Sequence, residues 1–504
     1  YKVAAENLTK VLYPNDNVSQ GRELRLIQEY FFVAASISDI LRRFKMENPD
    51  LKSLPEKAAI QLNDTHPSLA IVELMRILVD HEGLTWETAW EITTRLFAYT
   101  NHTIMPEALE KWPVPLLEKL LPRHLQIIYE INSRFLKEVM MKFPGDSDRV
   151  RRMSIVEEDT TKRIRMAMLA VVGSHSVNGV SELHSHLLKT QLFRDFYELW
   201  PKKFINVTNG ITQRRWLLKA NHSLANLITG SIGDRWVTDL DELVRILPLK
   251  EDASFRKKWQ EIKTGNKTHL ADYIKRTTGI SVDPASMFDI QIKRIHEYKR
   301  QLLFAFYIIS EYLKIKNKPS AKHLPRTFIV GGKSAPGYQF AKLTIKFINS
   351  IADVVNNDAD IKNRLKVVFL ENYRVSLAEK IMPAGDLSEQ ISTAGTEASG
   401  TGCMKFMVNG ALTIGTLDGA NIEILKEAGH ENIFIFGLTA KDVKELRIRG
   451  YDPRTYIDRS PVLKEIFALI HKNFFSPNEP GIFQQILTNM IYSDYYLVCA
   501  DFDS

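Results

Sequence analysis

Short apolar runs that end in polar loops recur along the chain, and a segment of longer, helical period follows each loop. Runs of this kind lie at 58–62, 168–172, 288–292, 327–330 and 365–370. We interpret these runs as buried strands followed by helices, because parallel strands joined by crossover helices alternate in this way. The pattern predicts an α/β fold. Ligands of such folds bind at the carboxyl ends of the strands, so the polar loops are the candidate site.

The run from Phe288 to Ile292 leads directly into a basic segment, for which we predict a helix from Lys293 to Tyr307. The segment begins Lys-Arg-Ile-His-Glu-Tyr-Lys-Arg. Several cations at the end of a strand could hold two phosphate groups together against their mutual repulsion. The alternative is that these basic side chains only cover a solvated helix surface.

A glycine-rich polar run from Gly395 to Gly402 opens a predicted apolar helix that carries Lys405 and ends at Gly410. Free backbone N–H groups at a helix start can hold a phosphate. Apolar residues at helical spacing flank Lys405, so its ammonium could be partly desolvated. Desolvation lowers the pKa of a lysine and favours imine formation with an aldehyde cofactor. The alternative is a capped core helix with an exposed lysine.

The composition of the chain mainly excludes some classes of protein. The chain is 44% hydrophobic and 25% charged, and its apolar runs are far shorter than the roughly 18 residues of a membrane span, so we predict no membrane association. Its two cysteines predict a reducing, cytoplasmic environment. The net charge of +7 is spread along the chain without a basic block, which argues against nucleic-acid binding.

Some histidines and carboxylates are candidate metal-binding or catalytic groups. His184 and His186 are two residues apart and face different sides of a helix, and no HExxH or CxxC spacing occurs, so the sequence predicts no metal site. Asp386, Glu389 and Glu397 leave a glycosidase-type carboxyl pair open. The chain begins with Tyr1 and ends just after an apolar stretch, which we interpret as a fragment.

Taken together, four segments of the chain resemble the glycogen/starch (α-1,4-glucan) phosphorylase family. They are 293–300, 371–380, 386–400 and 401–405, and the likeness extends through 61–67, 99–103, 173–179 and 208–210. The resemblance implies a GT-B type glycosyltransferase fold, with two Rossmann-like domains and a cleft between them. Residues 1–209 would be the C-terminal remainder of the first domain. Residues 210–504 would be the second, cofactor-binding domain without its C-terminal end.

The same resemblance assigns the site residues. Lys405 would form an imine with pyridoxal 5'-phosphate. The other predicted cofactor-binding residues are Thr401, Gly402, Tyr373, Arg374 and Trp216. The predicted catalytic residues are Lys293, Arg294, Lys299 and His102, of which the three cations would hold the cofactor and substrate phosphates. The predicted substrate-binding residues are Asn209, Tyr298, Glu397, Ser399 and Gly400, with Asp64 and His66 nearer the glucan.

The activity that the resemblance implies is phosphorolysis of an α-1,4-glucan polymer by inorganic phosphate. It would release α-D-glucose 1-phosphate with retained configuration, in a cytoplasmic enzyme that is a homodimer when full length. A phosphate with a second pKa of about 6 suits the implied proton transfer near neutral pH. Two other classes stay open: a catalytically inactive glucan-binding scaffold, and a nucleotide-sugar glycosyltransferase of the same fold class. Cys403 stands where the family usually has Asn.

Overall fold

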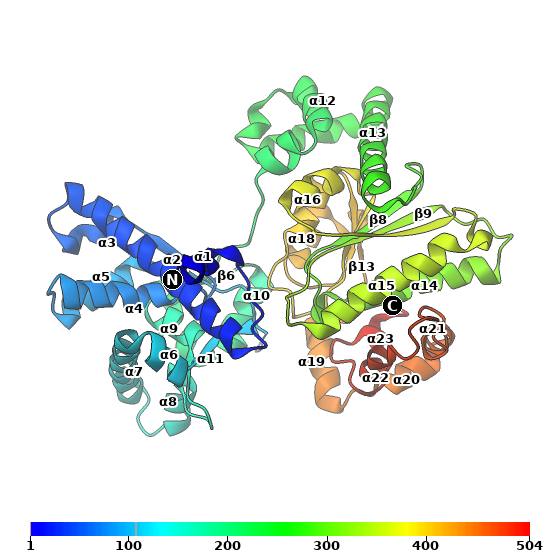
Figure 1. Cartoon of the computed structure of the whole chain (residues 1–504). Helices are drawn as coiled ribbons and strands as arrows, with labels where there is room; N and C mark the ends of the chain where they lie inside the picture. The colour runs from blue at the N-terminus through cyan, green and yellow to red at the C-terminus, as the bar shows by residue number, and fades with distance from the viewer. Residues whose placement is uncertain (1, 106–107) are drawn as a thin grey trace. The chain divides into compact units, whose positions relative to one another are not determined.

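The structure, a computed structural model, describes residues 2–105 and 108–504. The chain divides into two compact units, Tyr1–Thr208 (unit 1) and Asn209–Ser504 (unit 2) (Figure 1). No helix within the described ranges combines the length and the apolar character needed to cross a membrane.

Unit 1 contains a parallel sheet and a small antiparallel one. The described residues form a four-stranded parallel sheet of order β1-β2-β6-β7 and a three-stranded antiparallel sheet of order β3-β5-β4. The strands are β1 (Ile60–Asn63), β2 (Phe97–Thr100), β3 (Lys111–Pro113), β4 (Val156–Glu157), β5 (Arg163–Arg165), β6 (Val177–Gly179) and β7 (Phe204–Asn206). The helices are α1 (Lys2–Lys10), α2 (Ser19–Glu47), α3 (Leu54–Lys57), α4 (Leu69–Arg76), α5 (Trp86–Leu96), α6 (Val114–Leu120), α7 (Pro122–Lys142), α8 (Ser147–Met153), α9 (Met166–Val172), α10 (Glu182–Leu187) and α11 (Arg194–Leu199).

The apolar run from Met168 to Val172 is where the predicted secondary structure of unit 1 is wrong. We predicted a strand, and the structure places the run in helix α9, which is buried except at Met168. A continuous apolar run carries no period that distinguishes a buried helix from a buried strand. The strand of this region, β6, begins only at Val177, after the apolar run has ended.

Unit 2 is built on a six-stranded sheet whose strands all run parallel. Its order among the described residues is β10-β9-β8-β11-β12-β13, so the chain winds outward from β8 in one direction and then from β11 in the other. The strands are β8 (Met287–Ile292), β9 (Arg326–Gly331), β10 (Leu365–Leu370), β11 (Leu387–Gln390), β12 (Leu412–Gly415) and β13 (Ile433–Ile435). This is the doubly wound order 3-2-1-4-5-6.

Helices cover both faces of this sheet (Figure 1). They are α12 (His222–Ile232), α13 (Ala253–Thr278), α14 (Gln301–Asn317), α15 (Gln339–Asn357), α16 (Val375–Ile381), α17 (Gly402–Met407), α18 (Asn421–Ala428), α19 (Ala440–Arg449), α20 (Pro453–Arg459), α21 (Pro461–His471), α22 (Gln484–Tyr492) and α23 (Val498–Asp501). Because side chains alternate along a strand, Phe328 and Val330 pack toward α14 and α15, whereas Ile329 packs on the other face with residues of α13 and α16.

The helix predicted from Lys293 begins later than expected. Lys293 to His296 is not helical, a short 3₁₀ turn covers Glu297–Lys299, and α14 starts at Gln301. The reason is that β-type pairing continues past β8: the Lys293 N–H donates to the carbonyl of Gly331, the last residue of β9, and the Ile295 N–H donates to that of Lys333. The basic residues therefore lie in a loop at the edge of the sheet.

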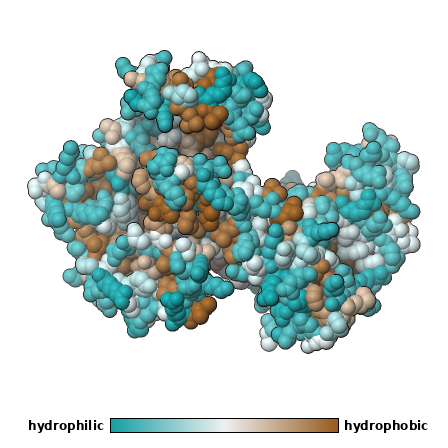
Figure 2. Space-filling view, turned by 180° about the vertical axis from the view of Figure 1, so that it is seen from behind, coloured by the Kyte–Doolittle hydropathy of each residue, from teal (hydrophilic) through white to brown (hydrophobic). Residues whose placement is uncertain are grey.

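The lobe of unit 2 that contains α12 and α13 also carries an apolar surface. Figure 2 shows apolar side chains gathered on this lobe, seen from behind. A groove of about 590 Å³ is lined there by apolar and amphipathic residues that include Leu247, Phe255 and Trp259. None of the predicted site residues lines it.

Candidate functional site

The candidate site of unit 2 lies where the strand order reverses. Strands β8 and β11 are neighbours at the centre of the sheet, although β9 and β10 intervene in the chain. In doubly wound sheets the ligand site lies at this point, at the carboxyl ends of the two central strands. The loop after β8 carries Lys293 and Lys299, and the loop after β11 carries Glu397, so the topology brings these segments to one edge.

Lys293 is held by a neutral partner. Its Nζ donates to Oε1 of Gln390 at 2.9 Å. Burial lowers the pKa of Lys293 to about 8, and the nearby charge of Lys299 acts in the same direction. Close backbone approach also fixes this loop, because a Cβ on Gly332 would come within 2.3 Å of the Lys293 carbonyl oxygen. Among the described residues, no carboxylate forms an ion pair with Lys293.

Lys299, unlike Lys293, is paired with a carboxylate. Its ammonium forms a close ion pair with Glu397, and the hydroxyl of Tyr298 donates to the same carboxylate at 3.4 Å. Burial is the largest single influence and would lower the pKa of Lys299, but the charges and hydrogen bonds of Glu397 and Tyr298 together outweigh burial and raise it. Burial likewise raises the pKa of Glu397, and Lys299 outweighs that effect and lowers it. Both groups of the pair are therefore charged at neutral pH.

The two arginines of the basic segment, Arg294 and Arg300, differ in their exposure and in their partners. Arg294 is exposed, and no ion pair to its guanidinium occurs within the described residues. Arg300 is fully buried; it donates to the backbone oxygen of Ile391 at 2.6 Å and pairs with Asp501 at 2.6 Å. Arg300 therefore stabilises the backbone of the loop after β11.

Lys405 lies half-buried against an aromatic ring. Its Nζ is 4.4 Å from the centre of the Trp216 ring, and burial lowers its pKa. Asn409 connects the two segments, because its side-chain amide donates to the backbone oxygens of Trp216 at 2.8 Å and Lys405 at 2.9 Å. The predicted desolvation is confirmed, and the alternative of a freely exposed lysine is not.

Helix α17, which carries Lys405, starts beside the Lys293 contact. A Cβ on Gly402 would lie 3.5 Å from the side-chain nitrogen of Gln390, so the helix start and the residue that binds Lys293 are neighbours. Thr401 precedes the helix and makes no capping bond with its side chain. Cys403 is buried, its thiol contacts the Gly400 oxygen at 3.7 Å, and burial raises its pKa to about 11.

The remaining residues predicted for this unit have varied surroundings. Tyr373 is half-buried after β10, and burial raises its pKa to about 12. Arg374 is exposed and donates to the Asn372 backbone oxygen at 3.1 Å. Ser399 is buried, and Gly400 adopts a φ of +79°, which favours glycine. Asn209 begins unit 2.

The carboxylates that left a glycosidase pair open have separate partners. Asp386 accepts from the Phe288 N–H at 2.8 Å and from Lys267 at 2.6 Å. Glu389 is buried in β11, where burial and the neighbouring Asp289 raise its pKa. Since Glu397 pairs with a lysine, these contacts do not support two carboxyls flanking a sugar.

The predicted residues of unit 1 gather after β1 and β2. Asp64 follows β1 with a φ of 70°, and its carboxylate accepts from the Thr65 N–H at 2.6 Å. His102 follows β2 and bonds to the side-chain oxygen of Asn63, and burial lowers its pKa. The adjacent strands therefore place Asp64 and His102 at one sheet edge.

His66 belongs to a charged cluster that the sequence did not reveal. Its Nδ1 lies 3.3 Å from Glu110 and 3.6 Å from Glu29, and these carboxylates raise its pKa to about 10. The three side chains are close enough to hold a metal ion, although no metal site was predicted. However, Arg25 pairs with Glu29 at 2.9 Å, so a cation already occupies one side of the cluster.

Sequence reasoning missed the residues that shape the loops. Gln390, Asn409 and Asp418 make no recognisable motif, but each contacts a segment that carries a predicted residue. Asp418 follows β12 at the same edge of the sheet. The only signal for it in the sequence is its position shortly after Gly415, and β12 itself was not predicted.

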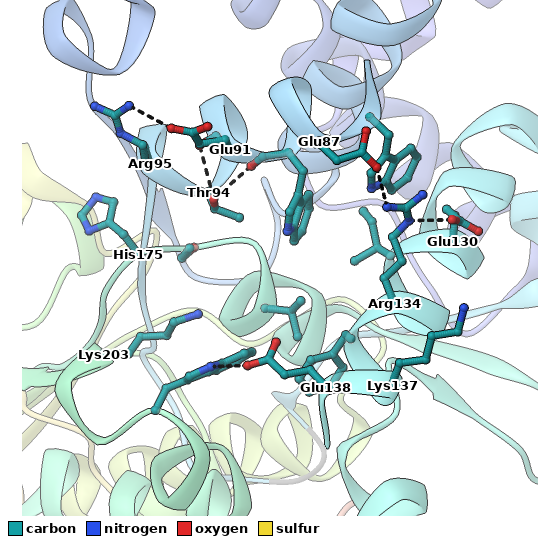
Figure 3. Close-up of a pocket in the computed structure, with 17 residues that line it drawn as sticks. Glu87, Glu91, Thr94, Arg95, Glu130, Arg134, Lys137, Glu138, His175 and Lys203 are labelled. Carbon is teal, nitrogen blue, oxygen red and sulfur yellow. Dashed lines mark hydrogen bonds and ion pairs between the residues drawn. The ribbon is translucent and has the colours of Figure 1, made fainter. Parts of the chain in front are cut away.

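A cavity of about 900 Å³ lies in unit 1, lined by parts of α5, α7 and the segment 172–203 (Figure 3). Arg134 pairs there with Glu130 at 2.6 Å, and the Trp200 indole donates to Glu138 at 3.0 Å. Lys203 lies 3.9 Å from a Trp200 ring centre. Because these cations are engaged within the wall, and no predicted site residue lines the cavity, we assign it no role in the site.

The cations and the desolvated lysine at the switch point of a doubly wound sheet are typical of proteins that bind phosphorylated ligands. Residues 1–504 match the carbohydrate phosphorylase family, and the chain belongs to this family. It is 56% identical over 507 residues to the muscle forms of glycogen phosphorylase from Bos taurus and Homo sapiens, which covers 99% of this chain and 60% of each relative. The identity to the brain form from Homo sapiens is 55% over 508 residues, with the same coverage. The chain thus spans about 60% of the length of these relatives.

Proposed function

We propose that this chain is part of an enzyme that cleaves an α-1,4-glucan with inorganic phosphate and releases α-D-glucose 1-phosphate with retained configuration. The observation that carries the proposal is the environment of Lys405: an ammonium 4.4 Å from the Trp216 ring centre, with a lowered pKa, in a member of the carbohydrate phosphorylase family. The names of the relatives, glycogen phosphorylases, support the choice of substrate.

The cofactor of the proposed enzyme is pyridoxal 5'-phosphate, attached to Lys405. Attachment of an aldehyde needs an unprotonated amine, and a lowered pKa increases that fraction, so the residue fits the group. When bound, the cofactor supplies a phosphate that can exchange a proton near neutral pH. The proposed surroundings of the cofactor are Trp216, Tyr373, Arg374, Thr401 and Gly402.

Lys293, Arg294 and Lys299 would hold the phosphate groups. Lys293 carries no bound carboxylate to compete for its charge, and Arg294 is exposed, so both can take an anion without first breaking an ion pair with a described residue. Lys299 would exchange Glu397 for phosphate oxygens, which releases Glu397 to accept a bond from a sugar hydroxyl. These cations would neutralise charge that develops during transfer, which is the main electrostatic contribution to such catalysis.

The sugar would be bound by polar groups from both units. Tyr298, Glu397, Ser399, Gly400 and Asn209 would bind the glucose hydroxyls. His102 would act at the reacting glucose unit, with Asp64 and His66 on the glucan side. The lowered pKa of His102 supports a neutral imidazole, which offers both a donor and an acceptor to hydroxyl groups.

We further propose the GT-B arrangement, in which units 1 and 2 belong to two Rossmann-like domains with the active-site cleft between them. The doubly wound order of unit 2 and the parallel sheet of unit 1 support this arrangement. A cytoplasmic homodimer is the proposed state of the complete protein.

The test uses the protein expressed to the full length of its reading frame. We expect phosphate-dependent release of glucose 1-phosphate from glycogen, starch or maltodextrin, and borohydride reduction should attach the cofactor to Lys405. Lys405→Ala should abolish both, whereas Lys441→Ala, at a lysine whose side chain is 84% exposed, should change neither. A glucan-binding scaffold would show no turnover, and a nucleotide-sugar glycosyltransferase would show no labelled lysine; either result would reject the proposal.

A further inference from the structure

The loop from Ser392 to Ser399, called here the site loop, is held at both ends by one other segment. This bracing segment runs from Thr416 to Asn421, after β12. The Thr416 hydroxyl donates to the Ser392 backbone oxygen at 2.6 Å, and the Ala420 N–H donates to the Ser399 backbone oxygen at 2.8 Å. The conformation of the site loop therefore depends on contacts from outside the loop.

Asp418 lies at the centre of the bracing segment and is 1% exposed. Its Oδ2 accepts from the Ser392 hydroxyl at 2.7 Å and the Glu397 N–H at 2.9 Å. Its Oδ1 accepts from the N–H groups of Gly395 and Gly419, both at 2.9 Å. A carboxylate has about four acceptor positions, so these donors, three from the site loop and one from Gly419 of the bracing segment, use its capacity.

Only a carboxylate suits this position. An asparagine would turn its NH₂ group either toward the N–H groups of Gly395 and Gly419 or toward the Ser392 hydroxyl and the Glu397 N–H. The hydroxyl can accept from an NH₂ group, but at least one backbone N–H then faces another donor in either orientation. The backbone approaches closely as well: a Cβ on Gly419, at a φ of +49°, would lie 2.4 Å from the Ser399 oxygen. The bracing segment and the site loop thus fit each other through both hydrogen bonds and shape.

We propose that Asp418 is a positioning residue for sugar binding, which fixes the backbone of Glu397 and the course of the loop to Ser399. The proposal rests on the function proposed above, in which these two residues bind glucose hydroxyls. Asp418 accepts from the backbone N–H of Glu397, and the carboxylate of Glu397 faces Lys299. It therefore acts through the site loop.

The first test is Asp418→Asn in the protein expressed to its full reading frame. We expect kcat/KM for glucan to fall by about 10²-fold, as small misplacements of binding groups do. Cofactor attachment to Lys405 should persist, because Lys405 is held through Asn409. The matched control is Asp358→Asn: Asp358 also accepts from a hydroxyl and a backbone N–H, at 2.8 and 2.9 Å, but precedes β10 at the opposite edge of the sheet. The control should keep kcat/KM within about twofold, as expected for distant, independent sites.

A double-mutant cycle with Glu397→Gln separates positioning from general destabilisation. If Asp418 acts through the loop that carries Glu397, Asp418→Asn should cost much less in the Glu397→Gln background than in the wild type. Fully additive losses would overturn the proposal. Loss of kcat/KM by the Asp358 control as large as that of Asp418→Asn would overturn it as well.

Amide hydrogen exchange gives a readout that needs no turnover. In Asp418→Asn, exchange should accelerate in peptides that cover residues 392–399, and unchanged exchange there would refute the positioning role. If Asp418→Asn does not fold, Ser392→Ala removes one bond to Asp418 and should produce a smaller change of the same kind. An inactive wild type rejects the proposed function, whereas an active wild type with an unaffected Asp418→Asn variant rejects only the positioning role.

Discussion

Arg300 offers a direct test of how unit 2 supports its site. The side chain is fully buried, pairs with Asp501 at 2.6 Å and donates to the Ile391 carbonyl at 2.6 Å. Arg300→Met keeps a long side chain at a position with a φ of 57°, so the backbone requirement is unchanged. The substitution removes only the charge and the donors, and leaves the Asp501 carboxylate without its cation and the carbonyls of Ile391, Ser392 and Leu497 without this donor.

The expected cost follows from these contacts. Removing one partner of a buried ion pair costs about 3–5 kcal/mol. The Leu438 N–H still donates to Oδ1 of Asp501 at 2.9 Å, which limits the loss, whereas the Ile391 carbonyl adds to it. We expect the free energy of unfolding to fall by about 4 kcal/mol, within the range for a broken buried pair. At about 2 °C per kcal/mol for a large domain, the midpoint of thermal unfolding should drop by roughly 8 °C.

The assay is thermal unfolding of the protein expressed to its full reading frame, followed by circular dichroism. Arg454→Met is the control, because Arg454 forms an exposed pair with Asp452 at 2.9 Å and such pairs contribute about 0–1 kcal/mol. The double variant Arg300→Met/Asp501→Leu should recover most of the loss, since apolar residues replace buried pairs well. A midpoint for Arg300→Met equal to that of Arg454→Met would refute the reasoning.

Three further predictions concern the site itself. The pKa of Lys293, lowered to about 8, means that its positive charge is present below that pH and lost above it. The KM for phosphate, measured from pH 7 to 9.5, should therefore rise above pH 8, and a flat profile would contradict the assignment. Trp216→Leu should expose the Lys405 ammonium to water and raise its pKa. Cofactor incorporation at pH 7, followed by absorbance, should then be slower, and unchanged incorporation would argue against the role of the ring. Burial raises the pKa of Cys403 to about 11, so brief iodoacetamide treatment should label its peptide only after unfolding. Labelling of the native protein would contradict the packing of α17.

Three of the six strands described in unit 2, β8, β9 and β10, were predicted, because their apolar runs end in clear polar loops, whereas β11, β12 and β13 were not. The run 365–370 matches strand β10, and 327–330 lies within β9. The same reasoning failed at Met168–Val172, where a continuous apolar run forms helix α9. It also failed after Ile292, because strand pairing that continues into the loop cannot be inferred from one segment alone.

The candidate site was predictable only in part. The apolar surroundings of Lys405 indicated desolvation, and the structure confirms it, but the ring that supplies much of the contact, Trp216, comes from a distant segment. Gln390 and Asp418 were not predicted, because their importance depends on which loops the strand order brings together. Tertiary contacts, rather than local patterns, therefore determine which polar residues serve the site.

The charged side chains of unit 2 have two roles: some hold the loops in place, and others lie at the candidate site. Buried or partly buried carboxylates engage the backbone or a cation behind the sheet edge: Asp418 binds the site loop, and Asp501 binds Arg300. At the edge itself Lys293 donates to the side-chain amide of Gln390, and Lys299 pairs with Glu397. The loop after β8 carries the cations Lys293, Arg294, Lys299 and Arg300 and the single carboxylate of Glu297, so the loop itself has an excess of positive charge. That excess costs desolvation energy, as the lowered pKa of Lys293 indicates, and an anionic ligand would remove this cost.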